Sequence, residues 1–123
     1  MLTEVVRAFD GMDIETADSQ GAPTVIWVDS QYWPGARDRN LCVVHLDVQK
    51  IAGTGATVTL VAEDSSGRIF VPLSLSNNTK TAKGSLRLVI KDFAANLNLG
   101  VQITANAALG SATFGLEYTL KAL

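Results

Sequence analysis

The stretch TVTLVAEDSSGRIFVPLS, residues 57–74, decides the fold class of this chain. Apolar and polar residues alternate on both sides of residues 64–67 (DSSG), which are all turn-forming types. Successive side chains of a strand point to opposite faces, so each alternating run is typical of a half-buried strand. The stretch therefore predicts a β-hairpin with a four-residue loop.

Placing Glu63 opposite Arg68 sets the register of this predicted hairpin. One face then holds three apolar pairs, which are Val58 with Leu73, Leu60 with Val71, and Ala62 with Ile69. A shift of one residue would turn that face to solvent, so we expect a well-specified register. The other face carries Val61 opposite Phe70. Because this outer face is partly apolar, both residues are candidates for a contact with another protein.

The rest of the chain repeats the same rhythm of short alternating runs separated by turn residues. Further strands are predicted over residues 24–29, 41–48, 86–91, 99–105 and 113–120. The sequence thus predicts an all-β protein, an antiparallel two-sheet β-sandwich of seven or eight strands. Jelly-roll and immunoglobulin-like strand orders both fit. An immunoglobulin-like domain favours a cysteine pair, and Cys42 is the single cysteine, so a jelly-roll-like order is preferred.

Residues 1–23 are predicted to be an N-terminal arm or a long loop, and residues 24–123 a single β-sandwich domain. Residues 10–11 (DG) indicate a turn, and residues 13–23 are polar, acidic and small. Three apolar residues near the start suggest that the arm is held by this domain's sheet or by a neighbouring subunit: Val5, Val6 and Phe9.

Composition excludes several classes of partner. The net charge is -2 without a basic cluster, so we expect no nucleic-acid partner. No apolar run approaches the roughly 18 residues of a membrane span, and the first residues do not resemble a signal peptide. We expect folding in a reducing cytoplasm. Charged residues make up 18% of the chain, below the usual share of about a quarter. This favours either a surface partly covered by a partner or a sandwich whose surface is rich in Ser, Thr and Asn.

Reactive residues are few. His45 and Asp47 share one face of a predicted strand and could form a hydrogen bond, whereas Cys42 lies on the opposite face. We therefore interpret His45 as a structural residue of the sheet and Cys42 as a small buried one. No nucleophile–base pair, metal-ligand set or phosphate loop can be assembled from the sequence. We expect neither catalysis nor a cofactor.

The loop over residues 31–40 is the strongest surface candidate. It holds Tyr32, Trp33, Arg37 and Arg39, residue types that are enriched at protein interfaces. Two alternatives stay open. Trp33 could fold back and cover one end of the sandwich, or the aromatic rings could stack on a sugar.

Three segments of the second half carry a family resemblance: residues 84–88 (GSLRL), 99–104 (LGVQIT) and 111–117 (SATFGLE). With the chain length, strand rhythm and low charge, residues 24–123 resemble the small cement or decoration proteins of tailed-bacteriophage capsids. The resemblance implies a virion structural protein, made in the host cytoplasm, that binds the major capsid protein on the capsid exterior. It also implies oligomerisation on the capsid lattice. The partly apolar outer face of the hairpin, with Val61 and Phe70, and the apolar start of the arm predict a homo-oligomer, for which a two-fold dimer is the commonest arrangement. The alternative is a carbohydrate-binding or receptor-binding β-sandwich module.

Overall fold

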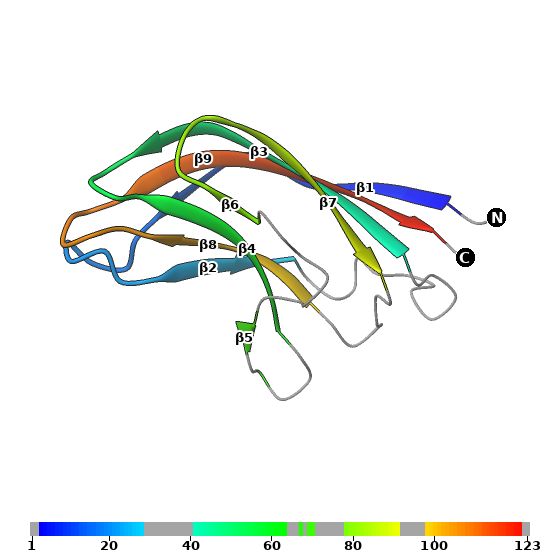
Figure 1. Ribbon diagram of the computed structural model, residues 1–123, viewed down its shortest axis with the longest axis horizontal. Helices are drawn as coiled ribbons and strands as arrows, with labels where there is room; N and C mark the ends of the chain where they lie inside the picture. The colour runs from blue at the N-terminus through cyan, green and yellow to red at the C-terminus, as the bar shows by residue number, and fades with distance from the viewer. Residues whose placement is uncertain are drawn as a thin grey trace.

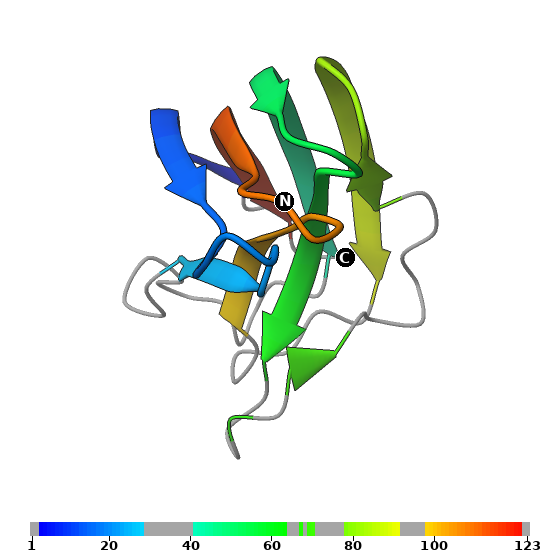
Figure 2. The ribbon, with the colours of Figure 1, turned by 90° about the vertical axis from the view of Figure 1, so that its left-hand side faces the viewer.

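The computed structural model describes residues 3–28, 41–63, 67, 69–70, 78–91 and 98–121. Within these ranges the chain forms strands and turns, and no helix long and apolar enough to cross a membrane is found. The strands lie in two stacked layers (Figure 1), and the separation of the layers is clearest when the sandwich is viewed from its end (Figure 2).

Sheet A is the longer layer. Its four strands lie in the order β1 (Thr3–Glu15), β9 (Ser111–Lys121), β3 (Leu41–Ala52) and β7 (Gly84–Lys91). Sheet B holds β2 (Thr24–Trp27), β8 (Asn98–Thr104) and β4 (Thr57–Glu63), followed by β5 (Ile69–Phe70) and β6 (Thr79–Lys80), which both pair with β4. All pairs are antiparallel. With β5 and β6 in one edge position, the order is that of an eight-stranded jelly roll. The predicted jelly-roll-like sandwich is confirmed.

The core lies between the two sheets and follows the predicted alternation. Val58, Leu60 and Ala62 of β4 are completely buried, while Thr57 before them and Thr59 between the first two are partly exposed. The opposing sheet buries the predicted faces of β3 and β9, which are formed by Cys42, Val44, Leu46, Val48, Phe114, Leu116 and Tyr118. Strand periodicity therefore identified the core residues on both layers.

The predicted register of the hairpin over residues 57–74 is wrong by one residue. In the structure Glu63 pairs with Ile69 and Ala62 with Phe70, so five residues, 64–68, separate the paired ends and not four. Gly67 within this loop has a φ of +82°. The faces of β4 are set by β8, which pairs with it continuously from Thr57 to Glu63. The inward residues of β4 were therefore identified correctly although their predicted partners were not.

The predicted N-terminal arm is a strand over Thr3–Glu15, paired with β9 at the edge of sheet A. Regular alternation does not mark this strand in the sequence because its pairing is irregular, with register shifts on both sides of Phe9. Gly11 has a φ of +66°, so residues 10–11 belong to an irregularity within the strand and not to the predicted turn. Phe9 packs edge-on against Phe114, with ring centroids 5.5 Å apart.

Residues 16–23 form the predicted loop and are fastened by side-chain hydrogen bonds. Asp18 Oδ1 accepts from the backbone N–H groups of Gln20, at 2.9 Å, and Ala22, at 3.1 Å. The Thr16 hydroxyl donates to the Asp18 carbonyl at 2.9 Å and accepts from the Gly110 N–H at 3.1 Å. The loop is thereby joined to the β8–β9 connection.

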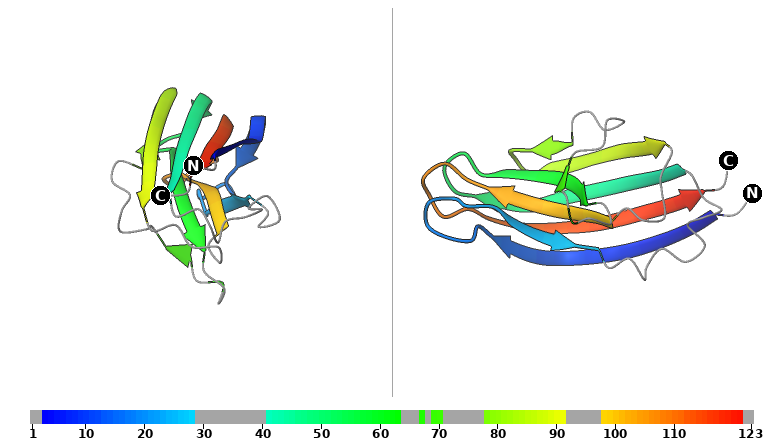
Figure 3. Two further views of the ribbon diagram at one scale, coloured as in Figure 1. Left: turned by 90° about the vertical axis from the view of Figure 1, so that its right-hand side faces the viewer. Right: turned by 90° about the horizontal axis from the view of Figure 1, so that it is seen from below.

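The two ends of the sandwich differ. At one end the β1–β2, β3–β4 and β8–β9 connections lie together (Figure 3). They are joined by backbone hydrogen bonds from Ala105 to Gly21, at 3.2 Å, and from Asn106 to Thr54, at 2.9 Å. Both chain termini lie at the other end (Figures 1 and 3). Strand β2 ends and β3 begins towards that end.

Candidate functional site

Four of the predicted interface residues, Tyr32, Trp33, Arg37 and Arg39, lie outside the described residues. The structure fixes only the strand ends on either side of them. These belong to different sheets, because β2 is in sheet B and β3 in sheet A.

The other two predicted interface residues do not form an exposed apolar pair. Val61 is on the outer face of sheet B as expected, but it is only 3% exposed, and Phe70 pairs with Ala62. The neighbour of Val61 on β8 is Gly100, and the Trp27 ring lies against this glycine. A Cβ added at Gly100 would come within 2.5 Å of Trp27 Cε3. Alternation predicts the face of a strand on which a residue lies, but not what covers that face.

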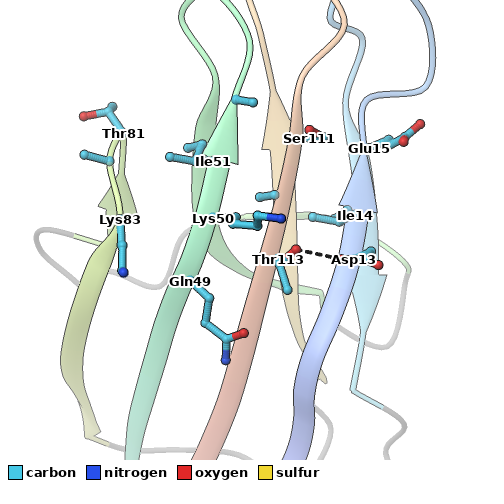
Figure 4. A pocket seen from close by; sticks show the side chains of 13 residues that line it. Asp13, Ile14, Glu15, Gln49, Lys50, Ile51, Thr81, Lys83, Ser111 and Thr113 are labelled. Carbon is cyan, nitrogen blue, oxygen red and sulfur yellow. Dashed lines mark hydrogen bonds between the residues drawn. The ribbon is translucent and has the colours of Figure 1, made fainter.

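A hollow of about 820 Å³ lies at one end of sheet A and was not predicted from the sequence (Figure 4). Its lining comes from β1, β9, β3 and the connection between β6 and β7. Asp13 and Glu15 stand on one side and Lys83 on the other, with Lys50 between them. No motif indicates this site because residues distant in the sequence form it, and only the strand order brings them together.

The lining of this hollow combines charged and hydroxyl side chains with apolar ones, which include Ile14 and Ile51. Thr113 Oγ1 donates a hydrogen bond of 2.6 Å to Asp13 Oδ1, across the β1–β9 pair. Asp13, Glu15, Lys50 and Lys83 are all exposed. Among the described residues, none of these four takes part in an ion pair within the chain. These four charges at the rim are therefore available to a charged partner surface.

A smaller hollow, of about 160 Å³, surrounds His45 further along the same face. Glu117 is the neighbour of His45 on β9 and pairs with Arg7 at 3.3 Å. Asp47 accepts a hydrogen bond of 2.9 Å from the Ser85 hydroxyl on β7, and no hydrogen bond joins it to His45. The serine is thus held by the carboxylate and not by the imidazole, which is not the arrangement of a nucleophile with its base.

Metal ligands do not cluster in the part of the chain that the structure describes. No group of three or more His, Cys, Asp or Glu side chains there could hold a metal ion. Cys42 is completely buried, and burial raises the pKa of its thiol from 9.0 to about 12.

This environment predicts a chemically silent thiol. At pH 9 the thiolate-to-thiol ratio of Cys42 is about a thousandfold below that of a thiol with a pKa of 9.0. Alkylation by iodoacetamide is therefore expected to be slow in the folded protein and fast after unfolding. Cys42→Ala is expected to cost about 1 kcal/mol of stability without altering partner binding. Rapid labelling of the folded protein would contradict this assignment.

The raised pKa of Cys42 also makes the free energy of unfolding depend on pH. Between pH 9 and about 12 the unfolded thiol ionises while the folded one does not. The contribution of Cys42 to the free energy of unfolding is therefore constant below pH 9 and falls as the pH rises towards 12. Cys42→Ala should remove this part of the decline.

Comparisons with known proteins identify the fold. No protein-family model and no curated protein matches the chain. Among solved structures, the chain is similar to VP2 of infectious bursal disease virus in a subviral particle. That match has a TM-score of 0.53 and 11% identity, and it covers 98% of this chain and 33% of the VP2 chain.

Two further structures match with lower scores. A chain of the Kashmir bee virus empty particle has a TM-score of 0.48 and 10% identity, covering 98% of this chain and 91% of that one. The CBM36-1 domain of a xylanase from the hindgut metagenome of Trinervitermes trinervoides has a TM-score of 0.41 and 9% identity, covering 95% and 96%. At such identities likeness concerns the fold alone, so what the comparisons establish is a sandwich fold shared with VP2.

Proposed function

We propose that this chain is a virion structural protein, a cement or decoration protein on the exterior of a tailed-bacteriophage capsid. Its partner would be the major capsid protein, and binding would stabilise the shell. The observation that carries the proposal is the strand order, β1-β9-β3-β7 over β2-β8-β4, which is a jelly roll. The VP2 of a subviral particle shares this fold. The resemblance of residues 24–123 to phage cement proteins supports the same reading. In this proposal the chain has no catalytic role and needs no cofactor.

The shell-binding site is proposed to lie in residues 29–40. Connections between strands carry function more often than the strands themselves, because a rigid sandwich can position them. Tyr32, Trp33, Arg37 and Arg39 supply the aromatic and guanidinium groups that form the energetic centres of protein interfaces. Repeated sites on a shell would allow many weak attachments to act together if copies of the chain associate.

Binding to empty shells tests the proposed site. We expect purified protein to co-sediment with phage shells that lack it, and Trp33→Ala or Arg37→Ala to raise the dissociation constant about tenfold or more. Lys80→Ala serves as the control because it removes a partly exposed cation from β6, which is outside residues 29–40 and pairs with β4 in sheet B. Lys80→Ala should bind like the unmodified protein.

The same variants distinguish the alternative function. If the protein fails to bind shells but is retained on an immobilised glycan, and Trp33→Ala abolishes that retention, it is a carbohydrate-binding module. If shell binding occurs and neither Trp33→Ala nor Arg37→Ala weakens it, the site lies elsewhere on the molecule.

A further inference from the structure

The outer face of sheet A separates its charges across the strands. On β1 and β9 the described side chains include four exposed or partly exposed carboxylates and one cation, Arg7, which gives -3. On β3, β7 and the connection leading into β7 they include three cations and one carboxylate, Asp47, which gives +2. The carboxylates of the first half are Asp10, Asp13, Glu15 and Glu117, and the cations of the second are Lys50, Lys83 and Arg87.

Most of these charges have no counterpart within the chain. Arg7 lies 3.5 Å from Asp10 and 3.3 Å from Glu117. Among the described residues, no ion pair involves Glu15, Lys83 or Arg87. Glu15 and Lys83 stand on opposite sides of the large hollow (Figure 4), about three strand spacings or roughly 14 Å apart. Among the described residues, no ion pair therefore joins the acidic half of the face to the basic half in one copy.

We infer that this face binds a second copy of the chain through a two-fold axis that runs along the strands. Rotation about an axis that lies in the face and follows the strands places the β1 edge of one copy over the β7 edge of the other. Each acidic half then meets a basic half. An axis running across the strands would place β1 over β1 and like charges together. Charge complementarity thus selects the partner and also the orientation.

The dimensions of the face suit such a pair. Four strands of up to 13 residues span roughly 40 Å by 19 Å, close to the approximately 800 Å² that each partner contributes to a standard interface. Small residues lie along its middle strands, including Gly115, Ser111 and Ala52. The large hollow of one copy would face the large hollow of the other, and the two would enclose water. The interface would therefore be polar, weak and sensitive to salt.

The dimer surface inferred here is the outer face of sheet A and not the hairpin face expected from the sequence. The apolar outer face of the hairpin was the reason for that expectation, yet Val61 is buried, and the predicted N-terminal arm is a strand of sheet A. The new location does not depend on the proposed shell-binding function, because self-association is measured without shells.

Sedimentation equilibrium with reversed charges tests the inference. We expect a concentration-dependent dimer at about 0.1 M salt that dissociates at about 1 M, where the screening length falls from about 10 Å to about 3 Å. Glu15→Lys or Lys83→Glu alone should raise the dissociation constant about tenfold or more, and combining them should restore association. Thr79→Lys is the matched control because it places a new lysine at an exposed strand position of sheet B, and it should leave the dimer intact.

Cross-linking supplies an independent measurement should a charge variant fold poorly. In the doubly substituted Glu15→Cys, Lys83→Cys protein the two thiols are too far apart to join within one chain. On oxidation this protein should form a disulfide-linked dimer, and either single variant should form much less. The inference is wrong if the protein is a monomer at low salt, if single reversals leave the dimer unchanged, or if the double reversal or the cysteine pair fails to join two copies.

Discussion

Leu60→Asp is expected to abolish folding. The Leu60 side chain is completely buried in the centre of the core, between Val58 and Ala62 on the inward face of β4. A carboxylate there would lose its hydration, and none of the core residues around it carries a cation. The penalty, several kcal/mol, is comparable with the entire stability of a domain of this size, about 5–15 kcal/mol.

The neighbouring position provides the control. Thr59 is on the outer face of the same strand and is partly exposed, so Thr59→Asp should be mild, at about 1 kcal/mol or less. Circular dichroism during heating distinguishes the two variants. A Leu60→Asp protein that melts like the unmodified one would show that the faces of β4 are assigned wrongly.

The second large effect is expected at Gly21. Its φ of +84° is a conformation that residues with a Cβ rarely adopt, and a Cβ there would collide with the Ala105 carbonyl group. Gly21→Ala should therefore cost about 3 kcal/mol, since it combines backbone strain with displacement of the β8–β9 connection. Gly21 also accepts a hydrogen bond from Ala105 at 3.2 Å, which that displacement would weaken.

Gly11→Ala distinguishes backbone strain from displacement of a neighbouring segment. Gly11 has a similar φ of +66°, but a Cβ there would meet no atom within 4 Å. Gly11→Ala should therefore cost only the strain, about 1 kcal/mol. Chemical denaturation of both variants gives the comparison. Equal losses at the two positions would mean that the contact between Gly21 and the β8–β9 connection does not stabilise the fold.

The fold class and the core were predictable because strand alternation is a local property. Leu60 and Cys42 were placed on buried faces by counting residues within single strands. The edge strand β1 was predicted only as an arm held by this domain's sheet or by a neighbouring subunit, because irregular pairing around Phe9 and Gly11 interrupts the alternation. The predicted register of the hairpin was wrong for a related reason. Turn-forming residues indicate where a loop lies, but the same sequence is compatible with a loop of four or of five residues.

The surroundings of the candidate surface residues could not be predicted from single strands. Val61 was assigned to the correct face, but its burial was not predicted. Its neighbour on β8 is Gly100, against which the Trp27 ring lies. The opposed charges of Glu15 and Lys83 are 68 positions apart in the sequence and face one hollow only because β9 and β3 lie between their strands. Such groupings follow from strand order, which no single segment encodes.

The thermal stability of phage shells tests the central proposal most directly. Shells lacking this protein would be heated with and without it, and their disruption followed by light scattering or by release of DNA to a dye. The proposal predicts that the protein raises the disruption temperature and that protection levels off when the shell sites are filled. An unchanged disruption temperature at saturating protein, with no protein bound to the shells, would contradict it.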